Sequence, residues 1–217
     1  PSSANYLASV CPRNTKFAIE CYTSWEDSDV DDDPLLHDPT LGPFISLKDA
    51  FQTSVNARNI LLDTFKIPDD NCKLIAAAIE QGTAIAVCDG SFDPNDRLGI
   101  AAFLMVANKK DQNKLTGTNW SPGTKEDQTA YRSELTGVDC ILAVLAILVK
   151  HYKIKKGVIT IAFDCATALK TCAKTDPLSI DMKCFDILQD IRNRMDILPI
   201  EVLWRWVEGH QLSLIHI

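Results

Sequence analysis

Three acidic residues stand where a strand or a helix could deliver their carboxylates to one point. Asp89 and Asp164 each end an apolar run typical of a buried strand, and Glu134 lies early in a long helical stretch. Carboxylates are the protein ligands that Mg²⁺ favours. Two divalent cations held by such a set stabilise charge on both the attacking and the leaving oxygen of a phosphodiester. The three residues therefore predict a two-metal site for phosphodiester cleavage.

The elements that must position these carboxylates follow from the periodicity of the apolar residues. Three strands separated by short polar turns predict an antiparallel meander, and two further strands alternate with helices. The fold class expected is α/β, with a mixed five-stranded sheet and helices packed on its faces. The expected strands are 83–89, 98–107, 115–120, 157–163 and 200–207. One expected helix starts at Ser46, and four more span 70–81, 128–152, 165–174 and about 181–195.

Two glycines have predicted roles beside the acidic residues. Gly90 should let the chain turn immediately after Asp89, and Gly137, one turn beyond Glu134, should let its helix approach the sheet closely. Trp204 and Trp206 alternate with Arg205 in the last expected strand, so both should face one side, where we expect core packing.

The composition is that of an ordinary globular protein. The chain has 217 residues, of which 46% are hydrophobic and 24% charged, and no apolar stretch reaches the roughly 18 residues of a membrane span. Its eight cysteines form no CxxC pair, so we expect reduced thiols and an intracellular location, cytoplasm or nucleus, with no membrane partner.

Charge divides the chain at about residue 82. Residues 1–82 carry 13 acidic and 6 basic side chains, whereas residues 83–217 carry 16 of each. Residues 1–82, with one expected strand at 16–22, are interpreted as a connector or the tail of a preceding polymerase region. Residues 83–211 are interpreted as the domain that holds the acidic site.

Four short motifs in this order resemble the ribonuclease H domain attached to retrotransposon reverse transcriptases. They are DGSF at Asp89, SEL at Glu134, FDC at Asp164 and WVEGHQ at His210. The resemblance covers about residues 83–211 and implies an RNase H-like fold. It also implies an endonuclease that hydrolyses the RNA strand of RNA–DNA hybrids, with an upstream reverse transcriptase domain in the same polyprotein.

The resemblance also assigns roles. Two Mg²⁺ ions, with Mn²⁺ as a substitute, would be held by Asp89, Glu134 and Asp164, and Asp89 would bridge them. His210 resembles a mobile histidine that assists proton transfer or product release, which suits a group titrating near neutrality. The candidates for substrate contact are Gly90, Ser91 and Asn119.

The chain departs from this pattern at its end. The family supplies a fourth carboxylate on a helix about ten residues after the histidine, and this chain stops seven residues after His210. Residues 212–217 resemble the translation of an adapter used in preparing DNA sequencing libraries, so we expect a non-native tail and a C-terminally truncated domain. Such a chain should bind the second metal weakly.

Other interpretations of the same residues remain open. Asp89 could belong to an Asp-Gly hairpin turn, Glu134 could pair with Arg132 or a lysine, and Asp164 could cap the helix that follows it. At the level of function, the rivals are a catalytically inactive RNase H-like tether or scaffold and a transposase- or integrase-type nuclease. The order Asp, Glu, Asp favours ribonuclease H, because transposases place their last acid after the second Asp.

Overall fold

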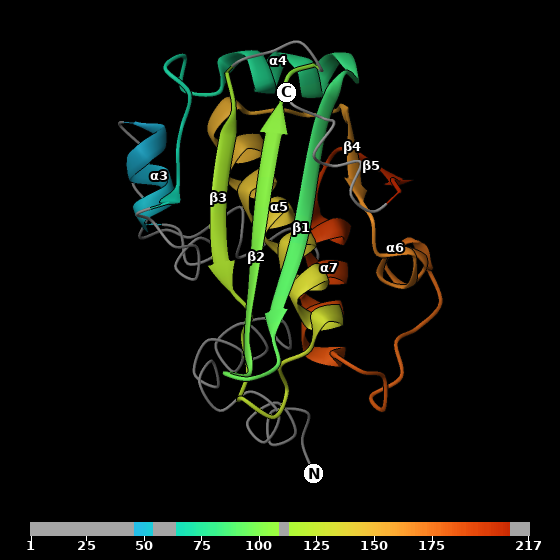
Figure 1. Cartoon of the computed structure of the whole chain (residues 1–217). Helices are drawn as coiled ribbons and strands as arrows, with labels where there is room; N and C mark the ends of the chain where they lie inside the picture. The colour runs from blue at the N-terminus through green and yellow to red at the C-terminus, as the bar shows by residue number, and fades with distance from the viewer. Residues whose placement is uncertain (1–45, 54–63, 109–112, 209–217) are drawn as a thin grey trace.

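A five-stranded sheet forms the centre of the protein (Figure 1). The computed structural model describes residues 46–53, 64–108 and 113–208. The strands are β1 (Ala84–Asp93), β2 (Leu98–Val106), β3 (Leu115–Trp120), β4 (Val158–Phe163) and β5 (Glu201–Trp206), and their order in the sheet is β3-β2-β1-β4-β5.

The sheet mixes two kinds of pairing. β1, β2 and β3 form an antiparallel meander, while β4 lies parallel to β1 and β5 lies parallel to β4. A parallel pair needs a crossover connection, and α5 (Ala130–Tyr152) supplies it between β3 and β4. This confirms the fold class expected from the sequence, with three antiparallel strands followed by two parallel additions.

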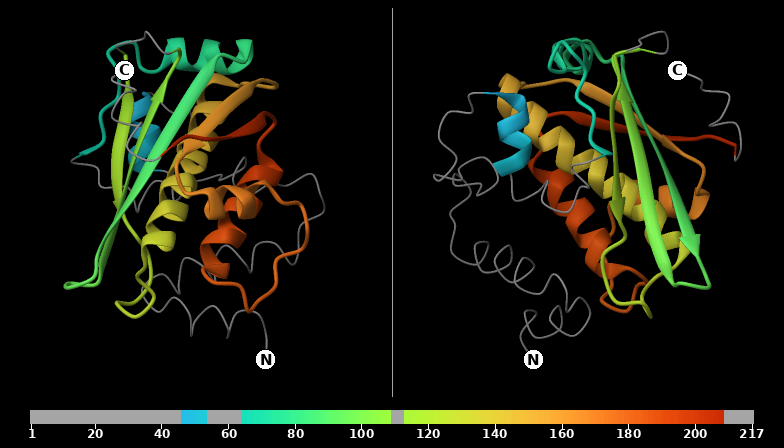
Figure 2. Two further views of the ribbon diagram at one scale, coloured as in Figure 1. Left: turned by 45° about the vertical axis from the view of Figure 1, so that its right-hand side comes forward. Right: turned by 60° about the vertical axis from the view of Figure 1, so that its left-hand side comes forward.

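The helices α5 and α7 (Phe185–Ile197) lie on the same side of the sheet (Figure 2). Most of α5 is buried, and its apolar side chains pack against the inward residues of β1 and β2, such as Ala86, Cys88 and Phe103. Three shorter helices complete the described part: α3 (Leu47–Thr53), α4 (Lys73–Gln81) and α6 (Ala166–Ala173). None of the helices in the described part has the length and apolar character to cross a membrane.

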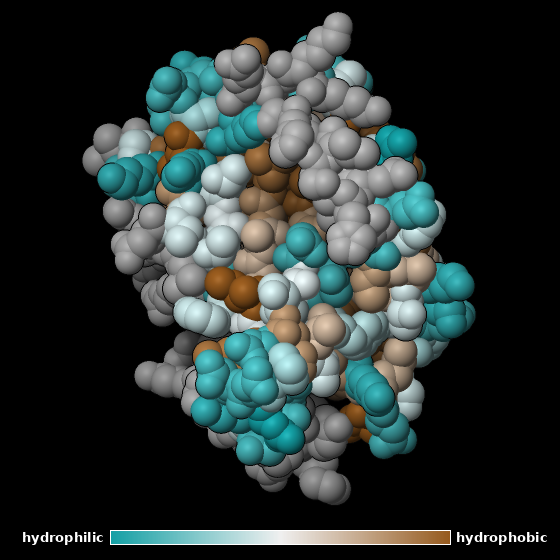
Figure 3. Space-filling model, in the orientation of Figure 1, coloured by the Kyte–Doolittle hydropathy of each residue, from teal (hydrophilic) through white to brown (hydrophobic). Residues whose placement is uncertain are grey.

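The opposite face of the sheet is apolar near its middle and hydrophilic at the end that carries the β1–β2 turn (Figure 3). Strand alternation and register put Ile85, Val87 and Leu104 on this face, and Asp89 follows them on the same side of β1. The first of the three acidic residues therefore lies on the side of the sheet away from α5.

Most predicted boundaries hold to within about two residues, and three differences are informative. The helix predicted over 70–81 begins at Lys73, because Asn71 and Cys72 adopt left-handed backbone angles, with φ of 55° and 65°. The Asp70 carboxylate accepts the backbone N–H of Cys72 and of Leu74 at this start. The last helix begins at Phe185 rather than near 181. The first sheet strand continues past Asp89 to Asp93. The strand predicted at 16–22 lies outside the described residues.

Candidate metal centre

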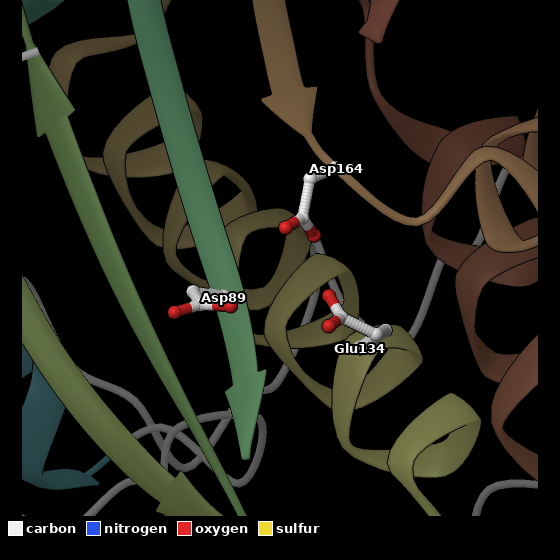
Figure 4. A group of neighbouring side chains, drawn as sticks. All are labelled: Asp89, Glu134 and Asp164. Carbon is white, nitrogen blue, oxygen red and sulfur yellow. The ribbon is translucent and has the colours of Figure 1, made fainter. Parts of the chain in front are cut away.

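Asp89, Glu134 and Asp164 come together beside the sheet (Figure 4). One carboxylate oxygen from each residue lies within 4.8 Å of the others. Asp89 is exposed, and the other two side chains are partly buried. The sequence predicted that these three carboxylates converge, and the structure places them close together.

The two aspartates owe their proximity to the parallel register of β1 and β4. The last paired residues are Val87 and Ala162, and Asp89 and Asp164 each follow two residues later. Corresponding positions on neighbouring parallel strands point to the same face. Because the pairing stops before the aspartates, the strands leave an opening into which a side chain from α5 can reach.

Glu134 enters that opening from α5, and two glycines allow the approach. A Cβ on Gly90 would lie 2.5 Å from the Glu134 backbone nitrogen, and a Cβ on Gly137 would lie 2.7 Å from the Cβ of Cys88. The Gly90 N–H also donates to the Glu134 carboxylate. The predicted role of Gly137 is confirmed.

The predicted role of Gly90 is wrong. Gly90 pairs with Ala101 inside β1, and the turn comes at 94–97, where Asn95 N donates to the Asp93 carboxylate at 2.8 Å. The hairpin-turn interpretation of Asp89 fails for the same reason. Glycine is needed at position 90 because the backbone of α5 lies so close that it leaves no room for a side chain.

The first turns of α5 are fixed by polar contacts, so the position of Glu134 is well defined. The Thr129 side chain accepts the Arg132 N–H at 3.1 Å as an N-cap. The Arg132 guanidinium pairs with Asp186 of α7 and donates to the carbonyl of Pro122. The predicted alternative of a Glu134–Arg132 ion pair is therefore wrong, because the buried guanidinium is directed at Asp186.

The environment of Glu134 fits a cation. Burial, followed by the charges of Asp164 and Asp89, raises the pKa of Glu134 to about 7, while the Gly90 N–H acts in the opposite direction. Its Oε2 atom is buried and has no hydrogen-bond partner among the described residues. A buried carboxylate oxygen without a partner is costly. A divalent ion at this point would satisfy the oxygen and offset the repulsion among the three carboxylates.

Asp164 does not serve as the cap of the helix that follows it. The N-cap of α6 is Cys165, and its side chain makes no capping hydrogen bond in the part of the chain that the structure describes. The capping interpretation is therefore wrong, and the Asp164 carboxylate is directed at Glu134 instead (Figure 4).

The remaining predicted site residues differ in where they lie. Asn119 is 7% exposed, and its amide donates to the Cys140 sulfur at 3.5 Å, so it faces the interior. Ser91 is exposed on β1, two residues beyond Asp89 and on the same face. His210 lies outside the described residues.

Two contacts of the site were missed by sequence reasoning. The Arg132–Asp186 pair joins residues 54 apart, and the Trp206 indole N–H donates to the backbone carbonyl of Asp164 at 2.9 Å. The prediction that Trp206 packs in the core is wrong, because this residue is 52% exposed. Neither contact has a local signal in the sequence, since both depend on which strands and helices become neighbours.

Comparison with known proteins gives a partial likeness. No family model matches the sequence, and no curated protein is significantly similar to it. Among solved structures, RNase H1 from Halobacterium salinarum NRC-1 is 14% identical, with 61% of this chain and 90% of that chain covered and a TM-score of 0.44. LC11-RNase H1, isolated from compost, is 12% identical, with coverages of 62% and 90% and a TM-score of 0.45. The N-terminal RNase H domain of Rv2228c from Mycobacterium tuberculosis is 10% identical, with coverages of 61% and 86% and a TM-score of 0.41.

Proposed function

We propose that this chain carries the metal centre of a Mg²⁺-dependent endonuclease that hydrolyses the RNA strand of RNA–DNA hybrids. The observation that carries the proposal is the convergence of three carboxylates, from β1, α5 and the end of β4, to within 4.8 Å. The Oε2 atom of Glu134 also supports it, because no residue in the described part of the chain satisfies this buried oxygen and a bound cation would.

Each residue has a distinct part in the proposed site. Asp89 is the exposed member and would face both the ions and the substrate. Glu134 and Asp164 are partly buried and would hold the ions from the side of the protein interior. When bound, divalent cations supply charge stabilisation at the scissile phosphate and lower the pKa of bound water. His210 is proposed to assist proton transfer or product release.

The substrate class rests on the motifs DGSF, SEL, FDC and WVEGHQ and their resemblance to ribonuclease H. RNA is distinguished from DNA through its 2′-hydroxyls, which donate and accept hydrogen bonds. Ser91 is proposed to contact the substrate, because its exposed side chain lies on the same face of β1 as Asp89. The proposed partner is an upstream reverse transcriptase domain, which would provide much of the binding affinity for the hybrid.

The test is Mg²⁺-dependent cleavage of an end-labelled RNA–DNA hybrid by the chain and by Asp89→Asn. Loss of an outer-shell partner of a metal ligand costs roughly 10–100-fold in activity or metal affinity, and loss of the ligand itself should cost at least that much. Asp93→Asn is the matched control. Asp93 lies on the same face of the same strand and only closes the turn, so this variant should cleave at the wild-type rate.

Two results would count against the proposal. Equal cleavage rates of Asp89→Asn and Asp93→Asn would show that the three carboxylates take no part in the cleavage. A wild-type chain that binds the hybrid but cleaves it with neither Mg²⁺ nor Mn²⁺ would favour an inactive tether or scaffold.

A further inference from the structure

Trp206 is both exposed and hydrogen-bonded through its indole nitrogen. It is the last residue of β5 at the edge of the sheet, and the residue is 52% exposed. Its indole N–H nevertheless makes a specific bond, at 2.9 Å, to the backbone carbonyl of Asp164. An exposed tryptophan held by its one polar atom indicates that the bond has a local task.

The bond fills a gap in the backbone hydrogen bonding around Asp164. The carbonyl of Phe163 accepts the Val207 N–H at 3.2 Å, which is the last rung between β4 and β5. The carbonyl of Cys165 accepts the Leu169 N–H at 3.0 Å, which is the first bond of α6. Between them the Asp164 carbonyl belongs to neither element, and the Trp206 indole provides its donor.

The bond to the carbonyl restrains the position of the Asp164 Cα. The carbonyl carbon and the Cβ are both attached to that Cα, so a carbonyl anchored to β5 helps to fix the point from which the carboxylate extends. Mg²⁺ demands nearly ideal octahedral geometry, and a displacement of about 1 Å at a reacting centre can cost roughly 10²-fold in rate. Because Asp164 follows the end of β4, the sheet alone does not hold it.

We infer that Trp206 is a positioning residue, which holds Asp164 in its metal-binding orientation through the indole N–H···O=C bond. This inference rests on the proposed metal centre. It gives the indole nitrogen a function separate from that of the ring, whose exposed face could instead stack on a nucleic-acid base.

The matched pair Trp206→Phe and Trp204→Phe separates these possibilities. Trp206→Phe keeps an aromatic ring and removes the N–H. Trp204→Phe makes the same change two residues earlier on the same strand face, where the indole packs edge-on against Phe163 with ring centroids 6.2 Å apart. Trp204 is the more buried of the two, so Trp204→Phe loses at least as much packing, but only Trp206→Phe loses a bond to Asp164.

The primary measurement is Mn²⁺ affinity, by isothermal titration of the chain and both variants, with melting temperatures taken in parallel. We expect Trp206→Phe to bind Mn²⁺ about 10-fold more weakly, in the range found for partners of metal ligands. Its kcat for hybrid cleavage should fall by a similar factor at unchanged KM, and Trp204→Phe should keep wild-type Mn²⁺ affinity. Equal Mn²⁺ affinities of Trp206→Phe and the wild type would overturn the inference, as would equal losses in both variants.

Mn²⁺ binding also separates this inference from the proposed function. A wild-type chain that binds Mn²⁺ without cleaving the hybrid contradicts the nuclease, and the two variants still decide the role of Trp206. A wild-type chain that binds no Mn²⁺ overturns both. Weaker hybrid binding by Trp206→Phe in EDTA, at unchanged Mn²⁺ affinity, would assign Trp206 to substrate binding and sink the positioning role.

Discussion

Glu134 has the least favourable environment of the three carboxylates. It is partly buried, it faces Asp164 and Asp89, and its Oε2 atom has no hydrogen-bond partner among the described residues. Its folded pKa of about 7 lies above the ordinary value of 4.5 for a glutamate, so the folded state binds the proton more tightly than the unfolded state. The stabilisation from this group is therefore complete below pH 4.5 and is lost as the pH rises through 7.

We expect Glu134→Gln to remove this pH dependence from the metal-free protein. In EDTA at pH 8 the variant should be more stable than the wild type by about 1 kcal/mol. Each pKa unit corresponds to roughly 1.4 kcal/mol, and solvent screening at a partly exposed group reduces the sum. At pH 5 the two proteins should differ little, as measured by urea unfolding.

The control for this comparison is Glu80→Gln, at an exposed position of α4. This variant should show the same stability difference from the wild type at both pH values. If the difference between Glu134→Gln and the wild type were also the same at pH 5 and pH 8, the repulsion among the three carboxylates would be ruled out as the cause.

At the scale of elements, the site depends on how closely α5 approaches β1. The helix touches the strand through Gly90 and Gly137, and it is fixed at its N-terminal end by the Thr129 cap and the ion pair between Arg132 and Asp186. Breaking a buried ion pair by removing one partner typically costs about 3–5 kcal/mol. The position of Glu134 therefore depends on contacts to three neighbouring segments.

Gly90→Ala should disturb both the fold and the site. The new methyl group would lie 2.5 Å from the Glu134 nitrogen and 2.6 Å from the Ser133 carbonyl carbon, which are backbone atoms and cannot rotate away. We expect a loss of about 1–3 kcal/mol in the free energy of unfolding, as for other overpacked sites. Mn²⁺ affinity should fall as well, because α5 must shift. Urea unfolding and isothermal titration measure the two effects.

Ser91→Ala provides the neighbouring control. Ser91 is exposed and lies on the face of β1 that carries Asp89, opposite to the face where Gly90 meets α5. Its stability should stay within about 0.5 kcal/mol of the wild type. A Gly90→Ala protein as stable as Ser91→Ala would show that α5 does not press on this strand.

At the scale of the whole molecule, the three carboxylates are far apart in the sequence, at residues 89, 134 and 164. The unfolded chain therefore has no preformed site, and a cation that binds the folded state shifts the unfolding equilibrium by mass action. Metal binding and folding should be linked in this protein even when no substrate is present.

The expected consequence is a melting temperature that rises with divalent cation. At a Mg²⁺ concentration about 100 times the dissociation constant, the gain is about 2.7 kcal/mol, which for a chain of this size corresponds to roughly 5–10 °C. Thermal unfolding in EDTA and in Mg²⁺ measures it. Asp89→Asn should lose the rise and Asp93→Asn should keep it. Identical melting temperatures of the wild type in EDTA and in saturating Mg²⁺ would contradict a metal centre.

The strands and the long helix could be predicted because their signals are local. The alternation of buried and exposed residues in β2 and the cap at Thr129 are properties of neighbouring residues. Asn119 and Gly90 could not be predicted in this way. Asn119 faces the interior because of the strand register, and the Asp-Gly pair looks the same in a turn as in a strand that a helix backbone touches.

The sequence alone determined which residues could bind a metal and which elements carry them, since residue type and periodicity are local properties of the chain. Only the tertiary structure decided that the three carboxylates meet and that Arg132 is paired with Asp186 rather than Glu134. It also decided that an exposed tryptophan donates to the Asp164 carbonyl. The physical reason is that register, strand divergence and helix approach arise from packing between distant segments, and no short stretch of sequence records that packing.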